Sequence, residues 1–321
     1  MRRTVPESRT TDSGSWPEDL DRLTHLLLRA PEVAGRLRQA RPDEEGPRSS
    51  GATFLRGEWW AADGARAPAL VKLGAGEQEV HWAQRLARHA PDVIPTLYAA
   101  GHGLGDEPLP WLVMERCPLL MDYGWGDQLF TMLLDAGVRF QLATRRIGPP
   151  VGAADVAVER FCAQVRRGAT STPPAPGPAG ELVEGLERTW RWVLSTCRVE
   201  RCHGDLHPSN AVWRTAPPDP ESRALLVDFI PQTLPWVSDA AYCQVLYWPA
   251  APPAYPSYVH EMAALRRAYG LEVPGADDLD RLTRIFLGWY AMRIWPGATH
   301  RHGIPAYVAA VRRWVAECAD A

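Results

Sequence analysis

Lysine is almost missing from this chain of 321 residues. It occurs once, as Lys72, and every other member of the 35 lysines and arginines is an arginine. The basic residues are balanced by 38 acidic ones, which gives a formal net charge of -3 at pH 7. A protein that binds a polyanion needs clustered positive charge, so this balance argues against nucleic acid and anionic membrane surfaces as partners.

Long apolar runs are missing as well. No stretch reaches the about 18 consecutive apolar residues of a membrane-spanning helix, and residues 1–6 lead into polar sequence instead of an apolar leader. The six cysteines form no Cys-x-x-Cys pair and have no ligand-like spacing to histidine, which argues against a zinc site and a disulfide framework. We therefore expect a cytoplasmic protein that contacts no membrane and keeps its thiols reduced.

Apolar residues nevertheless make up 46% of the chain, which is enough to bury a sizeable core. Residues 1–18 lack apolar periodicity and are predicted to form a loose arm. From Asp19 to Leu37, apolar positions at helical spacing predict an amphipathic helix that is interrupted near Pro31.

Strand patterns dominate the segment that follows. Apolar and β-branched runs predict four strands and one helix, in the order β-β-α-β-β. They cover residues 52–60, 68–73, 77–90 (the helix), 93–100 and 111–115. Beyond Cys117 the periodicity is helical, so the second part of the chain is predicted to be mainly α. The predicted helices cover 128–147, 153–167, 180–197, 258–269, 277–295 and 305–318.

Chemistry-bearing residues gather in His203-Gly204-Asp205-Leu206-His207-Pro208-Ser209-Asn210. A short apolar run, a proline-rich turn and a second apolar run ending in Asp228 follow, which predicts a small β-ribbon that brings Asp205, Asn210 and Asp228 together. Two carboxylates and an amide oxygen suit Mg²⁺, a cation that shares its shell with substrate phosphates. A single lysine among arginines fits the same chemistry, because a phosphate contact favours a compact ammonium.

The pattern His203-Gly-Asp205-x-x-x-x-Asn210, followed eighteen residues later by Asp228-Phe229, resembles the aminoglycoside phosphotransferase family of the protein-kinase-like superfamily. This resemblance implies an α+β, two-lobed protein-kinase-like fold. A small β-rich lobe would cover 19–116 and bind the nucleotide, and a larger, mainly helical lobe would cover 117–321. It also implies ATP, with GTP left open, and Mg²⁺ bound between the lobes.

The resemblance assigns roles residue by residue. Asp205 matches the catalytic base, Asn210 and Asp228 match the two metal ligands, and Lys72 matches the strand lysine that contacts the α- and β-phosphates. Glu79 resembles the helix carboxylate that pairs with this lysine, although a solvated helix face is the alternative reading of Glu79.

Further positions are implied around the nucleotide. Ser50 and Gly51 occupy the place of the covering loop, which is poor in glycine here. Met114, Glu115 and Cys117 occupy the place of the hinge whose backbone contacts the adenine.

Two residues are expected to support the catalytic loop. His203 is predicted to hydrogen-bond within the loop, since Asp205 already holds the base position. Asp239 resembles the aspartate that braces the loop, and capping of the helix that follows is the equal alternative. His207 could approach the metal or the substrate, but an exposed loop histidine is the expected reading. Ile230-Pro231 departs from the family pattern, which predicts a stiffer segment after Asp228.

The acceptor is predicted to be a hydroxylated small molecule. A polycationic acceptor would need an acidic cleft, but Asp277, Asp278 and Asp280 are better explained as charges at a helix start. The 14 tryptophans favour a neutral or weakly charged acceptor with sugar or ring systems, such as a nucleoside, a macrolide or a sugar-containing antibiotic, in resistance or self-protection. A monomer and a homodimer both stay open.

Two alternatives to this function remain. One is a metabolic kinase for choline, homoserine, methylthioribose or a sugar. The other is a catalytically silent pseudokinase, against which the complete set of Lys72, Asp205, Asn210 and Asp228 argues. A protein kinase is disfavoured because no Ala-Pro-Glu signature follows Asp228.

Overall fold

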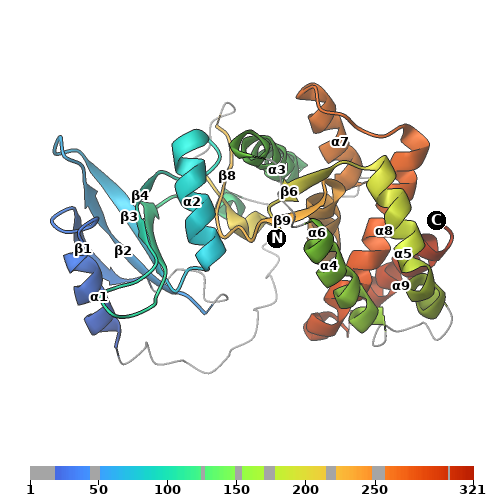
Figure 1. The fold of residues 1–321 in the computed structure, drawn as a ribbon, viewed down its shortest axis with the longest axis horizontal. Helices are drawn as coiled ribbons and strands as arrows, with labels where there is room; N and C mark the ends of the chain where they lie inside the picture. The colour runs from blue at the N-terminus through green and yellow to red at the C-terminus, as the bar shows by residue number, and fades with distance from the viewer. Residues whose placement is uncertain are drawn as a thin grey trace. The chain divides into compact units, whose positions relative to one another are not determined.

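The chain forms two compact units (Figure 1). The computed structural model describes residues 19–43, 51–123, 127–148, 154–169, 178–214, 222–247, 257–302 and 304–321. One unit contains the described residues up to Val80 and the segment Leu97–Arg116, and the other contains His81–Thr96 and the described residues from Cys117 onward. The sequence analysis placed residues 81–96 in the smaller lobe. In the structure they group with the second unit. The predicted arm at 1–18 and Ser50 lie outside the described residues.

The first unit is built on a five-stranded antiparallel sheet with the order β1-β2-β3-β5-β4. Its strands are β1 (Leu37–Pro42), β2 (Thr53–Trp60), β3 (Arg66–Leu73), β4 (Leu97–Gly101) and β5 (Trp111–Glu115). Helix α1 (Leu20–Arg29) precedes the sheet, and α2 (Glu77–His89) follows β3. The predicted hairpin is formed by β2 and β3, which pair over their whole length from Thr53↔Leu73 to Trp60↔Arg66.

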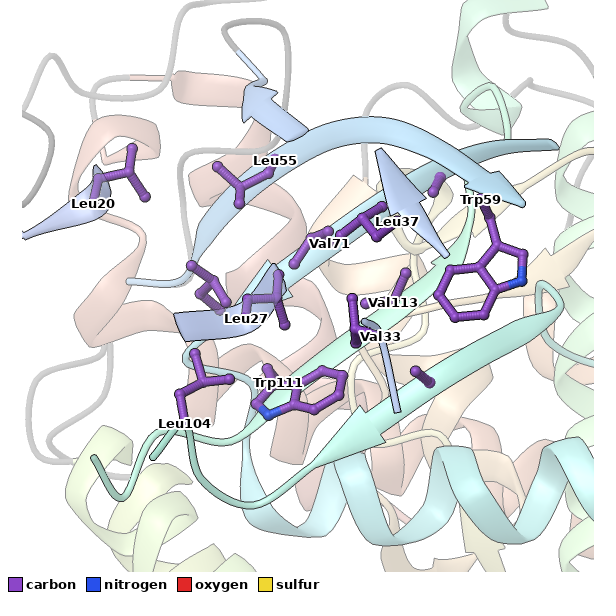
Figure 2. Close-up of a cluster of buried hydrophobic side chains, with 13 residues drawn as sticks. Leu20, Leu27, Val33, Leu37, Leu55, Trp59, Val71, Leu104, Trp111 and Val113 are labelled. Atoms are coloured by element: carbon purple, nitrogen blue, oxygen red, sulfur yellow. The ribbon is translucent and has the colours of Figure 1, made fainter. Parts of the chain in front are cut away.

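One strand of this sheet was missed by the sequence analysis. The predicted helix from Asp19 to Leu37 ends at Arg29, shortly before Pro31, and Leu37 begins β1. Val33 and Leu37 are buried against the sheet together with side chains of α1 and β2 (Figure 2). Their apolar spacing therefore reflects packing onto the sheet and not a continued helix, because proline ends the regular hydrogen-bond pattern.

The second unit is mainly helical. Its helices are α3 (Asp127–Ile147), α4 (Ala154–Ala169), α5 (Pro178–Thr196), α6 (Val237–Tyr247), α7 (Tyr258–Ala268), α8 (Ala276–Ile294) and α9 (Pro305–Ala319). Two short antiparallel ribbons accompany them: β6 (Val199–Cys202) with β9 (Gln232–Pro235), and β7 (Ala211–Val212) with β8 (Leu225–Leu226). The predicted α+β architecture, with a small β-rich part and a larger helical part, is confirmed.

Tryptophan mostly serves the core of these units. Trp289 packs 5.0 Å from the Trp190 ring and lies beside Phe161, and it is almost fully buried. Trp111, Trp213, Trp236 and Trp314 are equally enclosed. The high tryptophan content is therefore largely a packing feature. Within the described segments, no helix is both long enough and apolar enough to cross a bilayer.

Candidate functional site

The loop after β6 turns sharply at Gly204. This residue has φ +88°, and a Cβ built on it would lie 2.0 Å from the carbonyl oxygen of Ile230. The backbone N–H of Ile230 in turn donates to the carbonyl of His203 at 2.9 Å. A side chain is therefore sterically excluded at 204, and the segment that contains Ile230 packs its backbone directly against the loop.

Asp239 holds the same turn through a second set of contacts. Its carboxylate lies in the first turn of α6 and accepts the backbone N–H groups of His203 at 2.8 Å and Gly204 at 3.1 Å. Burial raises the pKa of the Asp239 carboxyl to about 6, although the two N–H groups favour its ionised form. Asp239 thus binds the loop with both oxygens instead of capping a helix.

His203 is fully buried inside this turn and bonds to the backbone through both ring nitrogens. Nε2 lies 3.1 Å from the carbonyl oxygen of Val227, and Nδ1 accepts the N–H of Asp205 at 3.3 Å. Burial lowers the pKa of His203 to about 4, so the imidazole is neutral near pH 7. A neutral ring with Nε2–H as donor satisfies both contacts.

The Asp205 carboxylate is held by three side chains. Oδ2 accepts from Asn210 Nδ2 at 3.0 Å and lies 3.4 Å from His207 Nε2, while Oδ1 accepts from the Tyr242 hydroxyl at 2.5 Å. Burial alone would raise the pKa of Asp205, but the contacts with His207 and Tyr242 lower it to about 2. The carboxylate is therefore ionised and fixed, with 27% of the side chain still exposed.

Asn210 and Asp228 lie on neighbouring segments of this unit. Asn210 Nδ2 also donates to the backbone oxygen of Asp205 at 3.0 Å, which directs the amide oxygen away from Asp205. The N–H of Val227 donates to the Asn210 carbonyl at 3.0 Å, so Asp228 follows one residue beyond a direct backbone link. Asp228 has φ +55°, a conformation that few residues other than glycine adopt.

This donor set fits Mg²⁺. An amide oxygen and a carboxylate are hard ligands, and Mg²⁺ commonly takes few protein ligands together with water and phosphate oxygens. No cluster of three or more His, Cys, Asp or Glu side chains suited to a metal occurs in the described part of the chain. The chemistry of Asn210 and Asp228 thus fits a metal that shares its shell with a phosphate better than a closed metal cage.

Lys72 and Glu79 form a buried ion pair in the first unit. Lys72 Nζ, on β3, lies 2.9 and 2.8 Å from the two oxygens of Glu79 in the first turn of α2. Their side chains are only 5% and 7% exposed. The solvated alternative for Glu79 is therefore wrong.

Three further residues predicted to lie around the nucleotide belong to the same unit, whereas Cys117 belongs to the second unit. Gly51 has φ +69° and precedes β2, while Met114 and Glu115 end β5, where they pair with Leu70 and Ala69. Cys117 follows β5 and is half-buried. The covering-loop residue Ser50 is not among the described residues.

Three contacts of the candidate site were not predicted from the sequence. His207, expected to be exposed, is partly buried between Asp205 and the Tyr247 hydroxyl, which lies 3.4 Å from its Nδ1. Tyr242, on α6, contacts Asp205 directly.

The third is a buried chain of polar contacts behind Asp239. Arg266 donates to Gln141 Oε1 at 2.6 Å, and Gln141 Nε2 lies 3.5 Å from Asp239. Only the spacing of Tyr242, three residues after Asp239 on a helix, could have signalled any of these contacts.

Comparison with known proteins places this geometry in context. The sequence model of the phosphotransferase enzyme family matches residues 66–229, which span β3 to the end of the Asp228-Phe229 motif. No curated protein matches the chain.

Several solved structures share the fold at low sequence identity. The macrolide 2'-phosphotransferase of Brachybacterium faecium is 17% identical, with a TM-score of 0.52 over 94% of this chain and 98% of that one. An ethanolamine kinase of Plasmodium vivax is 11% identical, with a TM-score of 0.51 over 87% and 81%. An aminoglycoside phosphotransferase of Streptomyces rimosus, solved with ADP and streptomycin, is 16% identical, with a TM-score of 0.50 over 87% and 98%.

Proposed function

The chain belongs to the phosphotransferase enzyme family and acts on a hydroxyl group, and from that premise we propose that it transfers the γ-phosphoryl group of ATP to a hydroxylated small molecule without a polycationic scaffold. An antibiotic of the nucleoside, macrolide or sugar-containing type is the acceptor we infer. The observation that carries the proposal is the Asp205 carboxylate, which is ionised, partly exposed and fixed by Asn210, His207 and Tyr242.

In the proposed reaction Asp205 orients the acceptor hydroxyl and takes its proton. The acceptor oxygen forms a bond to the γ-phosphorus, the bond from that phosphorus to the β–γ bridging oxygen breaks, and its electron pair leaves with ADP. A fixed carboxylate serves this step because the reacting oxygen must be held in line with the leaving group. The bracing of the loop by Asp239 supports the same role.

The phosphates require positive charge. We assign the α- and β-phosphates to Lys72, whose ammonium is held by Glu79 in the orientation that the fold dictates. Asn210 and Asp228 would hold Mg²⁺, which supplies charge neutralisation at the phosphate oxygens when bound. Backbone groups near Met114, Glu115 and Cys117 are proposed to contact the adenine, with Ser50 and Gly51 near the phosphates.

The acceptor class is supported by the distribution of charge along α8. Asp277, Asp278 and Asp280 lie in its first turns, where Asp280 pairs with His260 at 2.7 Å. Tyr290, near the other end of α8, lies about 15–20 Å further along the helix. It packs 5.6 Å from the Tyr242 ring, and Tyr242 contacts Asp205. The acidic cluster is therefore remote from Asp205, which favours an acceptor that needs no row of carboxylates.

The test is acceptor-dependent release of nucleoside diphosphate. Purified protein with Mg²⁺ and ATP or GTP is assayed against nucleosides, macrolides, sugar-containing antibiotics, aminoglycosides, choline, homoserine, methylthioribose and hexoses. We expect release with one neutral or weakly charged antibiotic, accompanied by the mass gain of one phosphoryl group. Asp205→Ala should lower turnover at least about a hundredfold and Asp228→Ala should abolish it.

Asp280→Ala is the matched control. It removes a carboxylate of the same unit that the proposal leaves out of the reaction, so its turnover should equal that of the wild type. Phosphorylation of an aminoglycoside would overturn the proposed acceptor class, and loss of activity in Asp280→Ala would overturn the statement that this carboxylate lies outside the reaction. Phosphorylation of choline or a sugar would establish the metabolic alternative, and a protein that binds no nucleotide would establish the pseudokinase.

A further inference from the structure

The two oxygens of Asp205 are occupied unequally. A carboxylate oxygen has two acceptor positions. Oδ2 faces two donors, Asn210 Nδ2 at 3.0 Å and His207 Nε2 at 3.4 Å. Oδ1 faces one, the Tyr242 hydroxyl at 2.5 Å, and no further donor to Oδ1 occurs among the described residues. Oδ1 is thus the oxygen with an acceptor position left for an incoming hydroxyl.

Tyr242 is itself held in place by its surroundings. It lies on α6, three residues after Asp239, so both side chains lie on the same face of the helix. Asp239 binds the backbone of the catalytic loop, and Tyr242 binds its functional side chain. The Tyr242 ring packs against the ring of Tyr290 at 5.6 Å, which adds a contact from α8. One helix face therefore fixes both the path of the loop and the plane of the Asp205 carboxylate.

The Tyr242 hydroxyl can act only as a donor to this carboxylate. Burial and the negative charge of Asp205 raise the pKa of Tyr242 far above its usual range, so the phenol keeps its proton. A hydrogen bond to an ionised acceptor is short and strong. The 2.5 Å distance fits that class of bond.

We propose that Tyr242 is a positioning residue for phosphoryl transfer, whose hydroxyl fixes Asp205 Oδ1 so that the remaining acceptor position of this oxygen meets the acceptor hydroxyl. This inference rests on the proposed function. Because the Tyr242 hydroxyl and the acceptor hydroxyl would bind the same oxygen, Tyr242 also borders the place where the acceptor oxygen lies. Loss of the Tyr242 hydroxyl leaves Oδ1 without a fixed donor and lets the carboxylate rotate away from the line of phosphoryl transfer.

The experiment compares two tyrosine-to-phenylalanine variants. Tyr242→Phe removes the hydroxyl at Asp205. Tyr269→Phe is the matched control, because the Tyr269 hydroxyl donates to another aspartate of the same unit, Asp135, at 2.7 Å. We expect Tyr242→Phe to lower kcat about ten- to a hundredfold with an unchanged KM for ATP, since hydrogen bonds to charged groups have that effect. Tyr269→Phe should keep the wild-type kcat.

A second measurement reads the contact without turnover. In tyrosine-labelled protein, the Tyr242 hydroxyl should give a slowly exchanging downfield proton NMR signal that is lost in Tyr242→Phe and shifts in Asp205→Asn. A wild-type kcat in Tyr242→Phe, a change confined to the KM for ATP, or an equal loss in Tyr269→Phe would overturn the inference.

The two proposals fail in different ways. If the wild type phosphorylates no acceptor, the proposed function fails, and the NMR signal still decides whether Tyr242 binds Asp205. If the wild type is active and Tyr242→Phe is equally active, only the inference about Tyr242 fails.

Discussion

Lys72 Nζ lies within 2.9 Å of both carboxylate oxygens of Glu79, and both side chains are buried in the first unit. The strand β3 and the first turn of α2 each supply one partner, seven residues apart. A buried ion pair costs desolvation free energy on both sides, and removal of one partner leaves an uncompensated charge. The two contacts with one buried carboxylate therefore hold the Lys72 ammonium in one orientation.

Disruption of this pair should destabilise the protein as well as lower its activity. Glu79→Ala leaves Lys72 buried without its carboxylate, so we expect the free energy of unfolding to fall by about 3–5 kcal/mol. Lys72→Arg keeps the charge but replaces a compact ammonium with a planar fork. We expect Lys72→Arg to raise the KM for ATP with a smaller loss of stability. Thermal unfolding and ATP titration measure both effects, and equal behaviour of the two variants would contradict this account.

The pKa of Asp239 predicts a pH dependence of activity. Burial raises it to about 6, so the carboxyl takes up a proton as the pH falls through 6. The protonated group presents an O–H toward the N–H groups of His203 and Gly204, and the catalytic loop loses its brace. We expect kcat/KM of the wild type to fall below pH 6, and we expect this fall to be absent from the residual activity of Asp239→Asn. If kcat/KM of Asp239→Asn falls over the same pH range, Asp239 is not the origin of the pH dependence.

The same shift acts on stability in the opposite direction. Between the usual pKa of 3.8 and the folded value of about 6, the folded protein binds this proton more tightly than the unfolded chain. The contribution of Asp239 to the free energy of unfolding therefore increases as the pH falls through that window. Activity loss near pH 6 should thus precede unfolding, which circular dichroism at the same pH values can verify.

Gly204 should tolerate no side chain. The built Cβ lies 2.0 Å from the Ile230 carbonyl oxygen at a positive φ, so Gly204→Ala displaces the loop that carries Asp205. We expect the free energy of unfolding to fall by more than the about 1–3 kcal/mol that backbone strain alone costs. We also expect kcat to drop about a hundredfold or more.

Gly270→Ala is the matched control for this substitution. Gly270 has φ +68° with no atom within 4 Å of the built Cβ, so it tests the backbone strain without the clash. It should lose only the strain contribution in thermal unfolding and keep its activity. Equal losses in both variants would show that steric exclusion at Gly204 has no separate effect.

Thiol reactivity should single out Cys117. Burial raises the pKa of Cys197 and of Cys318 to about 12 and that of Cys202 well above its usual range, whereas Cys117 is half-buried. The thiolate is the reactive form, so native protein should incorporate one equivalent of iodoacetamide rapidly, at Cys117. Mass spectrometry of digests locates the label, and Cys117→Ser should abolish the fast phase. Fast labelling of Cys202 would contradict the burial of the β6 end.

Local patterns were enough to predict most of the elements. The hairpin of β2 and β3, the strand β5 and the helices α3 to α5 and α7 to α9 follow from periodicity, because each is specified by neighbouring residues. The strand β1 was not predicted. Leu37 was read as part of a helix face, but in the structure it pairs with Trp59 across the sheet. Only the folded sheet distinguishes those two readings of Leu37.

The candidate site divides in the same way. The spacing of His203, Asp205 and Asn210 along one short loop, the single Lys72, and Asp228 at the end of an apolar run were sufficient to show the resemblance to a phosphotransferase family, because all of them can be found by position in the sequence. The contact of Tyr242 with Asp205 joins residues 37 positions apart. Its geometry depends on how α6 packs against the loop, so only the tertiary structure could show which oxygen of Asp205 keeps an open acceptor position.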